Sequence, residues 1–179
     1  PHSTLIYSKD GGETWTIGTG AKTNTTEAQV VELSDGSLML NMRDDRNRKD
    51  KSETNGRAVA ITKDLGKNRE IHPSSNSALQ EPNCMASLIA TDLTFDGADK
   101  RVLFFSNPNN KSQRTNMTIK ASLDEGITWP ETAQVELNEA GGFGYSCMTM
   151  VDENTVGILY EGVKELYFQS IPVADILQQ

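Results

Sequence analysis

The sequence is poor in the residue types on which many enzyme sites depend. Its 179 residues include only two histidines, His2 and His72, and two cysteines, Cys84 and Cys147. Two histidines offer little material for a histidine-based metal site or for a Ser-His-Asp triad. The cysteines lie too far apart to show metal-ligand spacing, so we expect buried free thiols, with a disulfide as the alternative. The sequence therefore predicts no metal site and no cofactor.

Positive charge and long apolar runs are also scarce. The formal net charge of -8 argues against nucleic acid as a partner, because phosphates require a basic surface. No apolar run approaches the roughly 20 residues that span a bilayer, so we expect no membrane insertion. An acidic chain does not attract anions at long range, and any anion recognition would depend on a few locally placed arginines. The length suits one domain over residues 1–179.

A repeat is the clearest pattern that the sequence does contain. Residues 8–15 and 122–129 both read S-x-D-x-G-x-x-W, and residues 62–69 keep the threonine, aspartate and glycine but end in Arg69. The three aspartates are 54 and 60 residues apart, which is the period of a supersecondary unit. Each copy predicts a hairpin turn in which the aspartate binds turn amides, glycine takes positive φ and tryptophan packs on the sheet. The pattern resembles the Asp box, and we expect it to be architectural.

The rest of the chain predicts strands and almost no helix, so the fold class is all-β. A repeat near 57 residues matches one four-stranded blade of a β-propeller, and the chain then holds about three blades. Since four blades are the usual minimum for closure, the chain is expected to be half of a larger propeller, unless the repeat is misread. A terminal helical turn is expected at residues 173–179. The expected strands are residues 28–33, 38–42, 58–62, 85–90, 102–106, 117–121, 134–137, 146–151, 156–160 and 165–171.

One hairpin, over residues 25–46, carries two charged groups at its open end. Asp35 and Gly36 predict a two-residue turn. Glu27 near the start and Arg43 near the end are then neighbours across the pair, and a surface ion pair is the simplest interpretation. Strand alternation predicts that Glu27 shares a face with Gln29 and Val31, and that Arg43 shares a face with Asn41, opposite the apolar side chains.

Three later segments of the sequence carry further short motifs. Ser-Asn-Pro at residues 106–108 precedes Arg114, a glycine-rich loop delivers Tyr145 into a strand, and residues 157–162 read GILYEG. With the Asp boxes and the hairpin, these motifs resemble the sialidases (neuraminidases) of the bacterial secreted type. The resemblance covers the whole chain, and it is specific because the motifs occur together in the family's order.

The resemblance implies roles for four residues. Tyr145 matches the tyrosine nucleophile, Glu27 matches the glutamate that accepts its proton, and Arg43 and Arg114 match the second and third arginines that bind the sialic acid carboxylate. Glu27 and Arg43 are thereby assigned to different partners, the phenol and the substrate. The family's first arginine and its acid/base aspartate have no counterpart in this sequence.

The implied protein is a six-bladed propeller that releases terminal α-linked sialic acid from glycoconjugates with retention, through a tyrosyl intermediate. This chain would supply about three C-terminal blades, the C-terminal half of the catalytic domain. Its expected partners are a sialylated glycan and the N-terminal half, present in the same or a separate chain, and by itself it should be inactive. The family also implies a secreted, periplasmic or cell-surface location.

Simpler interpretations stay open beside these roles. Tyr145 could be a half-buried strand tyrosine. Arg46, Arg48 and Arg57 are expected to be solvated, and Tyr160 and Glu161 are expected to be structural. At the level of the protein, the alternatives are a non-catalytic propeller that binds glycans or proteins, and a trans-sialidase that uses the same residues.

Overall fold

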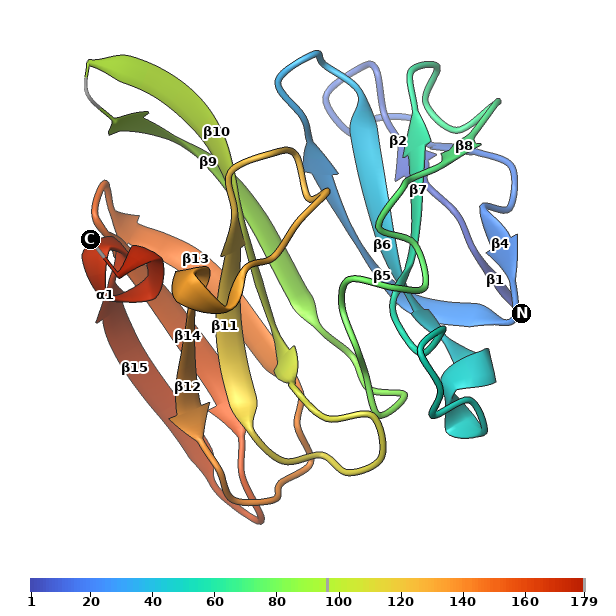
Figure 1. Ribbon diagram of the computed structural model, residues 1–179. Helices are drawn as coiled ribbons and strands as arrows, with labels where there is room; N and C mark the ends of the chain where they lie inside the picture. Colours follow the sequence, from blue (N-terminus) through green and yellow to red (C-terminus); the bar gives the residue numbers. More distant parts are fainter. Residues whose placement is uncertain (96, 179) are drawn as a thin grey trace.

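The regular secondary structure of the chain is almost entirely antiparallel β-strand. A computed structural model describes residues 1–95 and 97–178, and Figure 1 shows its sheets side by side. Three sheets are simple meanders, in which each strand pairs with the next one along the chain. They comprise β5 (Thr25–Glu32), β6 (Leu38–Asp44), β7 (Ala58–Thr62) and β8 (Glu70–Ile71); β9 (Ser87–Phe95), β10 (Ala98–Pro108), β11 (Met117–Ser122) and β12 (Gln134–Asn138); and β13 (Ser146–Asp152), β14 (Thr155–Glu161) and β15 (Leu166–Pro172).

The remaining elements are short. Two small sheets near the N-terminus pair β1 (His2–Ser3) with β4 (Lys22–Thr23) and β2 (Ile6–Tyr7) with β3 (Thr16–Ile17). The helical elements are η1 (Asp45–Arg48), η2 (Glu131–Ala133) and α1 (Val173–Leu177). All ten expected strands are confirmed to within a few residues, whereas the two-residue strands were not predicted. In the part of the chain that the structure describes, no helix is long and apolar enough to cross a membrane.

The first strands of the three large sheets lie next to one another. Strand β9 contacts both β5 and β13, so the sheets share an inner edge formed by their first strands. This arrangement is typical of propeller blades, which place the first strand of each four-stranded sheet nearest the central channel. The chain segments that lead into β9 and β13 therefore end near this shared edge.

Two apolar cores fill the spaces between the sheets. One includes Phe104, Ile119 and Ile158 and joins the sheet of β9–β12 to that of β13–β15. The other includes Met39 and Phe105 and joins the sheet of β5–β8 to that of β9–β12. On the opposite face of β6, Leu40 and Met42 belong to a third core, which includes Leu5. Strand β6 is therefore buried on both faces, which corrects the prediction of a single apolar face on this strand.

The three S/T-x-D-x-G turns have the predicted hydrogen bonds. In each copy the aspartate accepts the backbone N–H of the residue four positions later at 2.9 Å. The hydroxyl two positions before the aspartate donates to its carboxylate, and the glycine two positions after it has a φ of 97°, 84° or 79°. These turns are folded by their own side chains, as expected of an architectural motif.

The last position of each turn donates to the carbonyl of the turn's glycine. The indole N–H groups of Trp15 and Trp129 do so at 3.1 Å, and Nη1 of Arg69 does so at 3.0 Å. Trp129 packs edge-on against Phe105, with ring centroids 5.8 Å apart. Trp15, in contrast, is 62% exposed, so the expectation that it packs on a sheet is wrong for this copy.

Two further expectations are corrected by the fold. The turn between β5 and β6 is a three-residue loop closed by the Leu33 N–H and the Ser37 carbonyl at 2.8 Å, with Gly36 at a φ of 77°. A type I turn followed by a left-handed glycine explains this length. Both cysteines are free, but only Cys84 is buried, and Cys147 is exposed.

Candidate active site

Glu27 lies in a β-bulge near the start of β5. Thr26 pairs with Arg43 while Ala28 pairs with Met42, so Glu27 is an extra residue in the ladder. Its φ is +33°, a strained value for a residue with a side chain. The bulge breaks the alternation, and the prediction that Glu27 continues the face of the following residues is therefore wrong. The carboxylate is instead aimed at groups from β6 and from the loop before β13.

Arg43 is at the other end of this contact. Its Nη1 donates to Oε2 of Glu27 at 2.5 Å and lies 3.4 Å from the hydroxyl of Tyr145, and its Nη2 donates to Oδ1 of Asn83 at 2.9 Å. Arg43 is only 8% exposed. The simple ion pair therefore does form. Glu27 accepts hydrogen bonds from both neighbours, Tyr145 as expected and Arg43 in addition, and the assignment of Arg43 to the substrate carboxylate stays a prediction.

Tyr145 reaches the site from the glycine-rich loop. Its hydroxyl donates to Oε1 of Glu27, and its backbone N–H donates to Oε2 of Glu161 at 3.2 Å. Gly144 has a φ of 81°, and a Cβ there would lie 2.8 Å from Cγ of Pro108. Only glycine fits before the tyrosine, since both the conformation and the close approach exclude a side chain.

Arg114 borders the same phenol. Its Nη1 donates to the carbonyl of Phe143 at 2.7 Å, and its Nη2 lies 3.4 Å from the carbonyl of Asn83. The guanidinium carbon is 5.7 Å from the ring centroid of Tyr145, within the range of a cation–π contact. The structure thus brings together all four residues that the sequence singles out, from three sheets.

The ionisation of the central pair follows from these contacts. Burial opposes the charge of Glu27, but the hydrogen bonds from Tyr145 and Arg43 outweigh it and hold the pKa of the carboxyl below its ordinary value. The same hydrogen bond to Glu27, together with burial, raises the pKa of Tyr145. At neutral pH the site therefore holds a glutamate anion that accepts a hydrogen bond from a neutral phenol.

Most of the chain also matches a known protein family. The family model for the BNR repeat-like domain matches residues 1–158. The chain belongs to this family. In the described residues of this BNR repeat chain, no group of three or more His, Cys, Asp and Glu side chains could hold a metal ion.

Several relatives of this BNR repeat chain are sialidases. It is 49% identical to the sialidase of Bacteroides fragilis, over 99% of this chain and 32% of that protein. It is 34% identical to the sialidase of Micromonospora viridifaciens, over 87% of this chain and 23% of that protein. The solved structure of Hadza microbial sialidase Hz136 covers 98% of the chain with a TM-score of 0.88 and 49% identity, and the chain covers 33% of it. The resemblance to bacterial sialidases is confirmed, and the chain spans about a third of these relatives or less.

Three site residues were not predicted. Arg57, expected to be solvated, is fully buried and forms an ion pair with the equally buried Glu81 at 2.8 Å. Asn83 precedes β9 and holds Arg43. The clue that the sequence offers is weak: a polar Glu-Pro-Asn segment directly before a strand. Arg46 and Arg48 have side chains that are 43% and 62% exposed, as expected.

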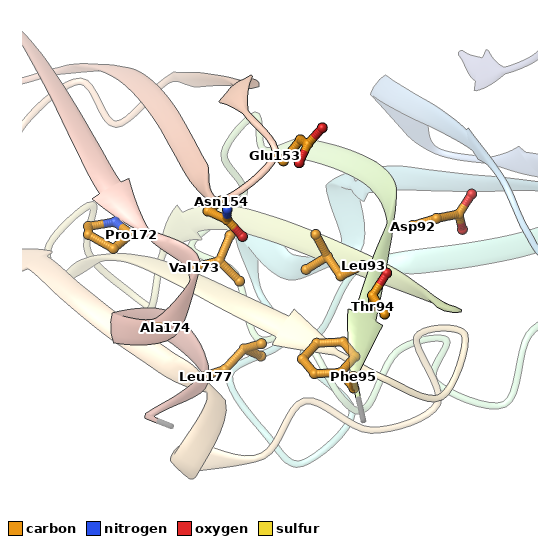
Figure 2. A pocket seen from close by; sticks show the side chains of 10 residues that line it. All are labelled: Asp92, Leu93, Thr94, Phe95, Glu153, Asn154, Pro172, Val173, Ala174 and Leu177. Atoms are coloured by element: carbon orange, nitrogen blue, oxygen red, sulfur yellow. The ribbon is translucent and has the colours of Figure 1, made fainter. Parts of the chain in front are cut away.

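A separate hollow lies away from these residues. It has a volume of about 640 Å³ and is lined by residues 92–95 of β9, residues 153–154 of the β13–β14 turn, and residues 172–174 and 177 around α1. Figure 2 shows Leu93, Phe95 and Leu177 facing the hollow, with Glu153 near its rim. None of the four predicted site residues lines it.

Proposed function

We propose that this chain supplies part of the active site of a retaining sialidase that removes terminal α-linked sialic acid from glycoconjugates. In this proposal Tyr145 is the nucleophile, Glu27 is its general base, and Arg43 and Arg114 bind the carboxylate of the substrate. The observation that carries the proposal is the hydrogen bond from the Tyr145 hydroxyl to Glu27 with Arg43 at its side. The sialidases among the relatives support the substrate class.

The chemistry favours a phenol over a carboxylate as nucleophile. Sialic acid carries a carboxylate on its anomeric carbon, so an anionic nucleophile would approach against like charge. A phenol is neutral, but its ordinary pKa near 10 makes it a poor nucleophile at neutral pH. A base within hydrogen-bond reach removes this difficulty, and Glu27 has that position.

The proposed reaction has two steps. As the phenolic oxygen of Tyr145 bonds to the anomeric carbon, its proton passes to Glu27, and the bond to the leaving glycan breaks while an acid outside this chain protonates the glycan oxygen. In the second step water attacks the anomeric carbon and gives a proton to that outside group, now acting as a base, while the phenoxide leaves and takes its proton back from Glu27. The product is sialic acid of retained configuration.

Two arginines suit the recognition of the substrate. A guanidinium stays charged and binds a carboxylate with two parallel hydrogen bonds. Nη1 of Arg43 lies 3.4 Å from the hydroxyl of Tyr145, and the guanidinium carbon of Arg114 lies 5.7 Å from the centroid of the same ring, so both cations border the candidate nucleophile. Arg43 already forms an ion pair with Glu27. In this proposal the substrate carboxylate binds to a guanidinium that is shared with Glu27.

We assign the missing catalytic and substrate-binding groups to a further segment of the catalytic domain, in the same chain or in another chain. That segment would bring the first arginine and the acid/base aspartate that the sialidase resemblance implies. The 179-residue chain alone is expected to be inactive. We place the protein outside the cytoplasm, as a secreted, periplasmic or surface enzyme, where sialylated glycans are accessible.

Replacement of the phenol tests the proposal. In the complete protein that carries this chain, Tyr145→Phe should lower kcat for natural sialosides by more than about 10³-fold while the fold is kept. The matched control is Tyr167→Phe, because Tyr167 also donates to a glutamate, Glu165, but lies on β15 and has no hydrogen bond to Glu27, Arg43 or Arg114. Near-normal turnover by the Tyr145 variant would reject the nucleophile assignment.

A further inference from the structure

One buried ion pair lies directly behind the candidate active site. Arg57 precedes β7 and Glu81 precedes β9, and the side chains of both are fully buried. Removing two charges from water is expensive, and apolar replacements of such pairs are often as stable. The pair is therefore not explained by stability alone, and its contacts indicate another role.

Arg57 uses its guanidinium to connect three segments. Its Nε donates to Oδ1 of Asn41 on β6 at 2.7 Å, and its Nη1 donates to the carbonyl of Cys84 at 2.8 Å. Its Nη2 lies 3.3 Å from the carbonyl of Glu27, the strained bulge residue. The guanidinium thus contacts the backbone of the residue whose side chain binds the phenol.

Glu81 supplies the matching contacts on the other side. Its Oε1 accepts the backbone N–H of Asp44 at 2.9 Å and the side-chain amide of Asn47 at 2.7 Å. Asp44 directly follows Arg43, so Glu81 fixes the end of β6 that presents this guanidinium. Two residues after Glu81, Asn83 binds Arg43 itself at 2.9 Å.

We propose that the buried ion pair of Arg57 and Glu81 positions the side chains of Glu27 and Arg43 in the geometry that catalysis requires. A residue at positive φ persists only where its surroundings fix it, and the contact from Arg57 to the carbonyl of Glu27 meets that need. Neither Arg57 nor Glu81 touches the substrate in this role. The consequence for catalysis rests on the proposed sialidase function, whereas the geometric claim does not.

Two variants separate positioning from plain stability. Arg57→Lys keeps a cation opposite Glu81, so no unpaired buried charge is created, but a single ammonium cannot make all of the contacts of the fork. The double variant Arg57→Met with Glu81→Gln removes both charges and leaves an amide oxygen for the N–H of Asp44. The control is Arg101→Met with Asp92→Asn, because that pair, at 3.3 Å, joins β10 to β9 and contacts none of the site residues.

The geometric readout is the titration of the Tyr145 phenol. It is measured by ultraviolet absorbance as the difference between each protein and the same protein carrying Tyr145→Phe, under conditions where circular dichroism shows the fold. Because the bond to Glu27 raises the pKa of Tyr145, both Arg57 variants should titrate at lower pH than the parent. The control should titrate like the parent.

The catalytic readout uses a fluorogenic sialoside and the complete protein. A misplacement of a catalytic group by about 1 Å can cost about 10²-fold in rate. For both Arg57 variants kcat/KM should therefore fall about 10²-fold, mainly through kcat, whereas the Arg101 and Asp92 control should keep the kcat/KM of the parent. An unchanged Tyr145 titration, or kcat/KM within about threefold of the parent in folded variants, would overturn the inference. If the parent protein hydrolyses no sialoside, the proposed function fails, and the titration still decides the positioning claim.

Discussion

The two tryptophans of the repeat provide a matched test of how the turns stabilise the fold. Both donate to the carbonyl of their turn's glycine at 3.1 Å, so the change to alanine removes the same hydrogen bond in each case. Trp15 is 62% exposed, whereas Trp129 is partly buried and packs against Phe105, which belongs to the core between two sheets. The difference between the two variants therefore measures packing.

The expected magnitudes follow from the buried area. A tryptophan side chain that is fully buried removes about 200 Å² from water, which is worth about 5 kcal/mol. Trp129→Ala should lower the free energy of unfolding by about 3–4 kcal/mol, including the edge-on contact with Phe105. Trp15→Ala, with much less area to lose, should lower it by about 1–2 kcal/mol.

Urea unfolding followed by far-ultraviolet circular dichroism is the appropriate assay, since tryptophan fluorescence changes with the substitutions themselves. The slopes of the unfolding lines should agree between the two variants, so that the midpoints report stability. Equal losses in the two variants, or a larger loss for Trp15→Ala, would refute the argument that packing against the neighbouring sheet distinguishes the two turns.

Three further predictions concern single residues. Gly144→Ala places a Cβ where the close approach and the φ of 81° exclude one. The free energy of unfolding should drop by about 1–3 kcal/mol, and the proposed sialidase activity should fall with it. A variant with unchanged stability and activity would contradict the steric argument for glycine at this position. Burial lowers the pKa of Lys120 to about 8. Between about pH 8 and pH 10.5 the unfolded chain therefore binds more protons than the folded chain, and the free energy of unfolding should rise by on the order of 3 kcal/mol as the pH increases. Lys120→Met should flatten this rise when stability is measured by urea unfolding at each pH. Burial also raises the pKa of Cys84 to about 11. Iodoacetamide should therefore add one group to the native protein, on exposed Cys147, and two groups in urea, as counted by intact mass spectrometry. Rapid labelling of both cysteines in the native protein would contradict the burial of Cys84.

The sequence predicted the strands well because their patterns are local. Residues 58–62 form an apolar run that ends at a repeat turn, and the observed strand β7 has those bounds. The bulge at Glu27 could not be predicted, because an even alternation in one strand does not reveal the register of its partner. Burial of Arg57 was missed for a similar reason, since its partner Glu81 lies 24 residues away in a polar loop.

The candidate site shows the same division. Composition and spacing identified charged residues at strand ends, but the roles of Tyr145 and Glu27 came from the resemblance to sialidases. Their contact spans 118 residues of sequence and arises because the first strands of neighbouring sheets lie together. Asn83 had only a weak sequence signature, since a single amide before a strand is common in ordinary loops.

The hydrogen bond of Arg69 has a practical consequence for finding such repeats. The repeat position is usually recognised by its aromatic ring, yet the middle copy satisfies the glycine carbonyl with a guanidinium at 3.0 Å. What the turn requires at this position is a long side chain with an N–H that reaches back three residues. A search profile that accepts arginine together with tryptophan there would count three copies of the turn in this chain where an aromatic-only profile counts two.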